Sequence, residues 1–317
     1  MLRRLAGSWW LRLGVTAAIL WWLSSRIDMR AAAAAVATVS LPRVLAVLAL
    51  VALDRMVMIW RWVLLLRAAD VPVSTRDAAR LFLVSSFVGS FLPAGVGGDA
   101  ARAWGLSQIT AKLGDALASV VVDRVLGVLA LAAMGAIGLA VSASGNATAR
   151  VGGAVGVVGL ACVAAFWSDA LLRWAVPSHR HDGPVARRLL RLADAVARYR
   201  DHRGALASVM AWSLVVQLLR ITQAYVLGLA LGMHVPFTYY LLFMPLGLLM
   251  LLLPISVSGF GVPQGVIVWL LRPMGVPDTL SFALSTLIVL TGLAGNLPGL
   301  VLWLRPANGA STAPARR

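Results

Sequence analysis

Charged side chains inside apolar stretches are the part of this sequence best suited to chemistry. Two arginines that lie near each other hold a phosphate through charge-assisted hydrogen bonds, and free N–H groups at the start of a helix attract anions. We therefore expect an anion site made by Gly97, Gly98, Asp99, Arg102, Asp123 and Arg124. The alternative is that these charges only neutralise one another and hold helices together.

The spacing of these charges also predicts how they pair. Asp99 and Arg102 are three residues apart and share one face of a helix. Asp123 and Arg124 are adjacent and point in different directions, so we expect them to bind different partners, with Asp99 as the partner of Arg124. Two further sets are polar residues in apolar runs. The pair Asp54-Arg55 is expected mainly to neutralise itself, and the helical stripe Gln217, Arg220 and Gln223 is a candidate lining of the same cavity.

Two segments interrupt apolar runs with the same pattern of Leu-Pro followed by a glycine-rich turn. The first spans 91–99 and the second spans 252–265. Proline removes an N–H and glycine permits positive φ, so both segments favour a break in a helix. Unwound backbone at membrane depth is tolerated where it lines a cavity. We therefore expect the second turn to contact the ligand through Ser258, Gly259, Gly261 and Gln264.

The elements that must position these residues are membrane helices. The chain has 317 residues, of which 60% are hydrophobic and 13% are charged, whereas a soluble domain carries about 25% charge. The distances between charges predict crossings near 9–25, 41–66, 115–143, 151–174, 205–232 and 280–304, with hairpins near 82–106 and 237–271. The fold class is thus an all-α polytopic membrane bundle with two broken-helix hairpins in an inverted repeat.

The expected organisation is one transmembrane domain over 1–305 and a disordered tail over 306–317. Its halves are about 41–143 and 205–304, joined through a basic segment near 177–203. Lys and Arg total 28 against 12 acids, and most arginines fall on the side that holds both termini, so the positive-inside rule makes the termini cytoplasmic. The basic segment is either a solvated connector or an amphipathic helix on anionic lipid.

Several function classes do not fit. The sequence Gly95–Gly98 is neither a dinucleotide fingerprint nor a P-loop, the histidines lack zinc-site spacing, and the arginines do not form a soluble basic face for nucleic acid. We expect no metal, no cofactor and no catalytic residue. An integral-membrane transferase remains a minor alternative, with Asp99 or Asp123 as its base.

Four segments in order resemble the signature segments of the lysylphosphatidylglycerol synthase transmembrane-domain family, also called flippase-like. They are Arg61–Arg67, Phe91–Arg102, Val122–Leu131 and Pro254–Gly261. The resemblance implies a multi-pass protein of a prokaryotic inner membrane that takes part in lipid translocation, without the soluble synthase domain of some members. Pro263-Gln264 stands where the family often has Arg-Glu, so the role of that acid does not carry over.

The function expected from this sequence is translocation of an anionic or phosphate-bearing lipid between the leaflets. The head group would be held between the two broken helices while the acyl chains stay in the bilayer. The alternative is a membrane scaffold that partners a lipid-synthesis enzyme through the basic segment. In that case Arg187, Arg188 and Arg191 matter and Arg102 does not.

Overall fold

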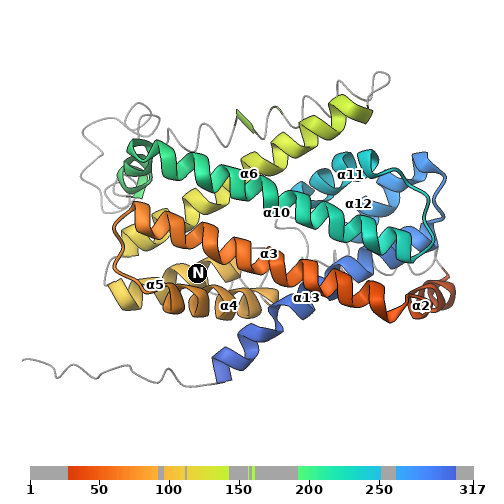
Figure 1. The fold of residues 1–317 in the computed structure, drawn as a ribbon, viewed down its shortest axis with the longest axis horizontal. Helices are drawn as coiled ribbons and strands as arrows, with labels where there is room; N and C mark the ends of the chain where they lie inside the picture. The colour runs from red at the N-terminus through yellow and green to blue at the C-terminus, as the bar shows by residue number, and fades with distance from the viewer. Residues whose placement is uncertain are drawn as a thin grey trace, which may run out of the picture.

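Helices make up all the regular structure in the described residues. A computed structural model describes residues 28–91, 96–110, 113–142, 156, 159–160, 192–250 and 262–304. The helices are α2 (Met29–Ala37), α3 (Leu41–Ala68), α4 (Thr75–Ser90), α5 (Val96–Thr110), α6 (Leu113–Ser142), η2 (Arg198–Asp201), α10 (Arg203–Ala230), α11 (Phe237–Met250), α12 (Val262–Leu271), η3 (Arg272–Met274) and α13 (Asp278–Leu304). The expected all-α class is confirmed, and the long helices α3, α6, α10 and α13 run along the bundle (Figure 1).

Three described helices are long and apolar enough to cross a bilayer on their own. They cover Leu113–Val141, Arg203–Ala230 and Asp278–Leu304, and the pair α2 and α3, bent by 87°, qualifies as a fourth. These correspond to the crossings predicted near 115–143, 205–232, 280–304 and 41–66. The crossing near 9–25 and, except for residues 156, 159 and 160, the one near 151–174 lie outside the described residues. The protein is therefore a multi-pass membrane protein.

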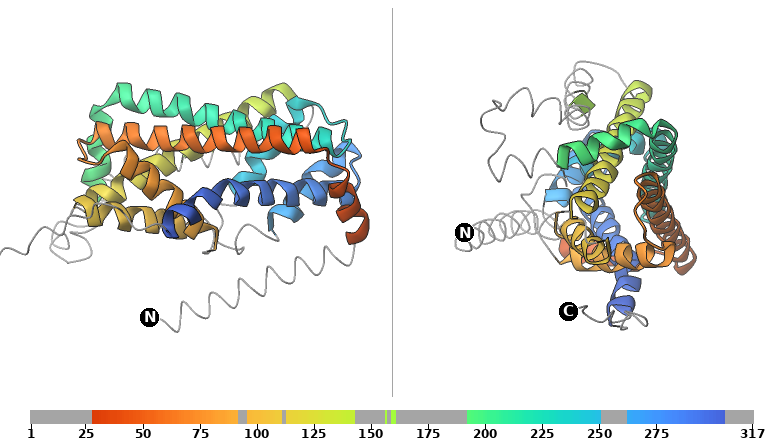
Figure 2. Two further views of the ribbon diagram at one scale, coloured as in Figure 1. Left: turned by 60° about the horizontal axis from the view of Figure 1, so that its bottom comes forward. Right: turned by 90° about the vertical axis from the view of Figure 1, so that its left-hand side faces the viewer.

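The two hairpins enter the bundle from opposite ends. Helices α4 and α5 pack together at one end, and α11 and α12 pack together at the other (Figures 1 and 2). The first hairpin is longer than the predicted 82–106, because the Ser74 hydroxyl accepts the Asp77 N–H at 3.1 Å and starts α4 earlier. The second hairpin begins and ends at the predicted 237 and 271. The tips, at 92–95 and 251–261, lie outside the described residues.

Helix contacts repeat between the halves 41–142 and 203–304. The antiparallel helices α3 and α10 pack along each other, and α4 packs on α13 just as α11 packs on α6. Likewise α5 packs on α6 and α12 packs on α13. Each half therefore places its hairpin against the last helix of the other half, which is the contact pattern of the predicted inverted repeat.

Glycines allow the closest crossings at equivalent places in the two halves. A Cβ atom built at Gly138 of α6 would lie 2.3 Å from the carbonyl group of Leu241 in α11. A Cβ atom at Gly299 of α13 would lie 2.1 Å from the carbonyl oxygen of Leu83 in α4. Since small residues let membrane helices approach backbone to backbone, these two glycines set how tightly each hairpin packs on the opposite half.

Apolar cores lie toward the two ends and leave the middle for polar groups. One core gathers Val47, Ile221, Tyr240, Phe243 and Leu284 around the second hairpin. Two others gather around the first hairpin and the nearby ends of α3, α6 and α10, with Trp62, Phe82 and Leu106 in one and Leu65 and Val122 in the other.

Replacing Gly138 with valine is expected to lower the free energy of unfolding by about 1–3 kcal/mol, the usual effect of overpacking. The new side chain would start 2.3 Å from the backbone of Leu241. Thermal unfolding in detergent, followed by the loss of monodisperse protein, measures this. Gly114→Ala is the control on the same helix, because a Cβ atom there meets nothing within 4 Å. Equal stability of the two variants would contradict the close crossing.

Candidate functional site

A cavity of about 500 Å³ with charged side chains in a largely apolar wall lies between the two halves. Helices α3, α4, α5, α6, α10, α11 and α13 all contribute to its wall. Eight charged residues line it, namely Asp54, Arg55, Arg61, Asp99, Arg102, Asp123, Arg124 and Arg220. These charges form two separate networks.

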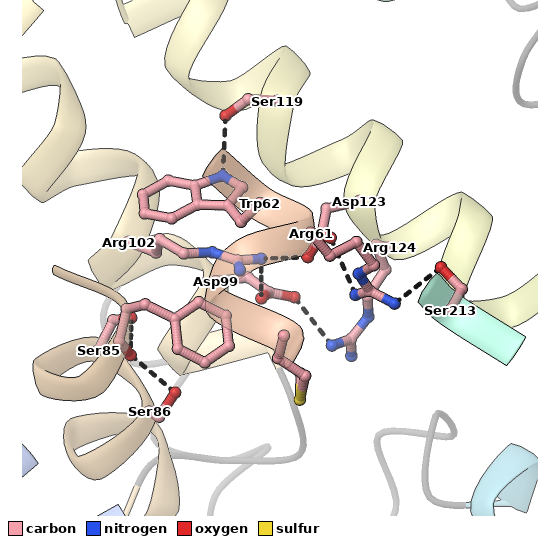
Figure 3. Close-up of polar contacts among 12 residues, drawn as sticks. Arg61, Trp62, Ser85, Ser86, Asp99, Arg102, Ser119, Asp123, Arg124 and Ser213 are labelled. Atoms are coloured by element: carbon pink, nitrogen blue, oxygen red, sulfur yellow. Dashed lines mark hydrogen bonds and ion pairs between the residues drawn. The ribbon is translucent and has the colours of Figure 1, made fainter. Parts of the chain in front are cut away.

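The first, here called the hairpin network, is a chain of five charges from α3, α5 and α6 (Figure 3). Arg124 binds Asp99 at 2.9 Å, and Asp99 also binds Arg102 at 3.2 Å. Asp123 then joins Arg102 at 3.1 Å to Arg61 at 2.9 Å. Asp123 is therefore the carboxylate that ties three helices together.

Burial divides the hairpin network into a structural part and an accessible part. The side chains of Arg61 and Arg102 are 5% exposed and that of Asp123 is 4% exposed, whereas Arg124 is 39% exposed and Asp99 26%. The Arg102 guanidinium also lies over the rings of Trp62 and Phe82, at 5.0 and 5.2 Å from their centroids. Arg102 is thus held on several sides, and Arg124 is the most exposed arginine of this network.

Neighbouring hydroxyl groups complete the buried end of the hairpin network. Arg61 donates to Ser213 of α10 at 3.0 Å, and the Trp62 indole N–H donates to Ser119 of α6 at 3.4 Å (Figure 3). Buried donors with partners avoid the desolvation penalty of unpaired polar groups. The arrangement therefore fixes α3 against both α6 and α10.

The second, here called the midspan network, joins α3 to α10. Asp54, 4% exposed, accepts from Arg55 at 3.0 Å and from Arg220 at 3.1 Å. The sulfur of Met58 lies 2.9 Å from a terminal nitrogen of Arg220 and 3.5 Å from one of Arg55. Both arginines line the cavity. Asp54 thus neutralises Arg55 and, through Arg220, also locks α10 against α3, as expected of charges that pair and hold helices together.

The predicted pairing of charges is confirmed, and five of the predicted site residues line the cavity. Asp99 pairs with Arg124, and Asp123 and Arg124 have different partners. The lining includes Gly98, Asp99, Arg102, Asp123 and Arg124. Gly97 and Gln264 are not among the described lining residues; Gln264 is buried on α12, with 1% exposure. Ser258, Gly259 and Gly261 lie outside the described residues.

Gly98 has a packing role in addition to its place beside the cavity. A Cβ atom there would lie 3.0 Å from the carbonyl oxygen of Ser85, and one at Gly89 would lie 2.6 Å from the Cα atom of Gly98. The glycine pair therefore brings α4 and α5 together. Gly97 and Gly98 also fall in the first turn of α5, where backbone N–H groups have no acceptor within the helix.

Sequence reasoning missed several residues that shape the cavity. Arg61 was expected only as part of a segment that resembles the family, not as a site residue. In the structure it is one end of the hairpin network. Asn296 donates to Ser90 at 2.8 Å and joins α13 to α4 beside the cavity. A helical spacing signal was present, because Asp54 and Arg61 are seven residues apart, as are Ser213 and Arg220. In each case two turns separate the residues on one face.

Replacing Asp123 with alanine is expected to lower the free energy of unfolding by about 3–5 kcal/mol, because Arg61 and Arg102 would then lack their shared buried carboxylate. Chemical or thermal unfolding in detergent measures the change. The control on the same helix is Asp115→Ala, which breaks only the exposed pair with Arg198 and should change stability by about 1 kcal/mol or less. Similar effects at both positions would show that Asp123 is not the structural anchor.

The segments that resemble a known family also meet at the cavity. Three of the four segments that suggested a family supply the hairpin network, through Arg61, the pair Asp99 and Arg102, and the pair Asp123 and Arg124. No curated protein matches the chain. The family model described as "Lysylphosphatidylglycerol synthase TM region" matches residues 9–299 of the 317. The chain therefore belongs to the family of the lysylphosphatidylglycerol synthase TM region.

Proposed function

We propose that this protein moves a lipid with a phosphate-bearing head group between the leaflets of the inner membrane, through the cavity between its two halves. The observation that carries the proposal is the charge of that cavity. Its described lining holds five arginines against three aspartates. Family membership supports a role with membrane lipids.

The surplus of positive charge favours an anionic ligand. Three carboxylates neutralise three guanidinium groups, which leaves an excess of two positive charges in the described lining. Ionisable groups at bilayer depth are costly unless paired, and they mark substrate pathways. A phosphate group with one or two negative charges complements this excess, and arginine binds phosphate oxygens through two parallel N–H groups.

Arg124 is the first contact that we propose for the head group. It is the most exposed arginine of the hairpin network, and its partner in that network is Asp99, itself 26% exposed. A phosphate oxygen would replace Asp99 on the guanidinium, and the first-turn N–H groups at Gly97 and Gly98 would add donors. Arg102 and Asp123 would hold the geometry from behind. The turn of the second hairpin, with Ser258, Gly259 and Gly261, would complete the site from the other half.

Transfer would follow from motion of one half against the other. The hairpins enter from opposite ends, and in transporters with inverted repeats such an arrangement opens a midplane site to each side in turn. The acyl chains would remain in lipid while the head group crosses the cavity. No catalytic step forms part of this proposal.

The arginines support an orientation with cytoplasmic termini. Arg67, Arg76 and Arg203 lie at the end of the bundle where α3 ends and α4 and α10 begin. The opposite end has Arg30, Arg43 and Arg272. Several more arginines occur in 173–203, which leads into α10, so the positive-inside rule places the end with Arg67 in the cytoplasm.

Arg124→Gln is expected to slow transbilayer transfer of fluorescent phosphatidylglycerol in proteoliposomes by about tenfold or more, the effect of losing one charge-assisted hydrogen bond. Arg124→Lys should retain part of the rate, because it keeps the charge but loses the bidentate geometry. Transfer is measured by chemical quenching of the label in the outer leaflet.

The matched control is Arg76→Gln, which removes an exposed arginine at the start of α4, away from the described cavity lining. It should transfer lipid at the wild-type rate. Melting temperatures of all variants separate loss of transfer from loss of folding. Wild-type transfer by a folded Arg124→Gln protein would remove Arg124 from the site, and absence of lipid transfer by the wild-type protein would overturn the proposed function.

A further inference from the structure

We propose that the midspan network is a second anion site, at which the head group stops after leaving Arg124. This inference rests on the proposed function and deepens it. The ligand class is an oxyanion, either the phosphodiester of a lipid head group or a free phosphate. The site consists of Arg55 and Arg220, with Asp54 behind them and Met58 between them.

The two arginines of the midspan network have weak partners on the cavity side. They share a single carboxylate, that of Asp54. Their other described contacts are the Met58 sulfur and, for Arg55, the carbonyl oxygen of Gly292 at 3.4 Å. The Nε atom of Arg55 is buried without a hydrogen-bond partner. A guanidinium offers five N–H donors and a thioether is a weak acceptor, so a phosphate oxygen would bind here more strongly than the sulfur does.

A ligand in the cavity reaches these arginines. The side chains of Arg220 and Arg55 are 28% and 18% exposed, and both line the cavity that Arg124 lines. Gln223 lies nearly one turn beyond Arg220 on α10 and also lines the cavity, and its buried Nε2 atom has no hydrogen-bond partner. Buried polar groups are normally paired, so this amide is a further donor for an oxyanion.

The two networks lie at different levels along α3. Asp54 and Arg61 are the α3 residues of the midspan and hairpin networks. Seven residues of helix span about 10 Å, which is about a third of the hydrocarbon core. Gln217 lies between the two levels on α10 and donates to the carbonyl oxygen of Gly127 at 3.3 Å. The path between the sites therefore includes polar groups.

Each network carries one positive charge more than its carboxylates neutralise. The hairpin network has three arginines and two aspartates, and the midspan network has two arginines and one aspartate. An anion thus finds the same local excess at both levels. Transfer requires binding that is strong enough for the ligand to enter and weak enough for it to leave. Asp54 would supply this balance, because its carboxylate competes with the anion for both arginines.

The test compares variants of the full chain in two assays. The first is the rise in melting temperature on adding phosphatidylglycerol in detergent, with phosphatidylcholine and inorganic phosphate as separate arms. The second is transfer of labelled phosphatidylglycerol in proteoliposomes. The variants are Arg220→Gln, Arg220→Lys and Asp54→Asn. Arg203→Gln, at the exposed start of α10, is the control.

Arg220→Gln is expected to lower transfer by about tenfold or more and to reduce the shift caused by phosphatidylglycerol, with partial recovery in Arg220→Lys. Asp54→Asn should move the two readouts in opposite directions. The rise in its melting temperature with phosphatidylglycerol should exceed that of the wild-type protein, because the anion no longer competes with a carboxylate. Its rate of lipid transfer should fall, because the anion dissociates more slowly. A variant that merely misfolds does not gain a larger ligand shift.

A second site is overturned if Arg220→Gln matches Arg203→Gln in both assays while Arg124→Gln has lost transfer, and the proposed function then stands. An equal shift with phosphatidylglycerol in the wild-type protein and in all three midspan variants would also overturn it, because the midspan residues would then not contact the phosphodiester. A shift with inorganic phosphate that depends on Arg220 supports the anion site and assigns it a free oxyanion. Absence of lipid transfer by the wild-type protein would instead overturn the proposed function.

Discussion

The pairing of buried charges is the constraint on which the rest of this structure depends. A charge left alone at bilayer depth is costly, so each buried aspartate here holds arginines from more than one place. Asp123 holds Arg61 of α3 and Arg102 of α5, and Asp54 holds Arg220 of α10. These bridges join α3 to α5, α6 and α10 beside the cavity.

The arginines of the cavity differ in how far they are buried and in how many partners they have. Arg102 lies between two carboxylates and two aromatic rings and is 5% exposed, so it is held in place on several sides. Arg124 and Arg220 are more exposed, and each binds one carboxylate. In the proposed function, an incoming anion would exchange most readily with a carboxylate that is itself accessible, as Asp99 is. The proposed motion would keep the Asp123 bridges intact, because both partners of Asp123 are buried.

Much of the candidate site followed from local spacing. Arg61 was missed because of a contact between distant segments, and the start of α4 was missed because of a local cap. The i, i+3 relation of Asp99 and Arg102 and the divergence of Asp123 and Arg124 led to the right partners. Arg61 was missed because its partner is 62 positions away along the chain. The predicted start of the first hairpin came from the spacing of charges, which treats Arg76 and Asp77 as lying outside the apolar run. The helix nevertheless begins before these residues, because Ser74 caps it.

The amino-acid sequence by itself determined that this is a membrane protein, where its long helices run and where proline and glycine interrupt the apolar runs. Hydropathy, charge spacing, proline and glycine act within a turn or two of their own position. It also determined the family. Only the tertiary structure decided which arginines are held and which face the cavity. Exposure and pairing depend on how helices α3, α5, α6 and α10 surround one cavity. Residues of equal charge and similar local surroundings differ there because a second or third helix either covers them or does not.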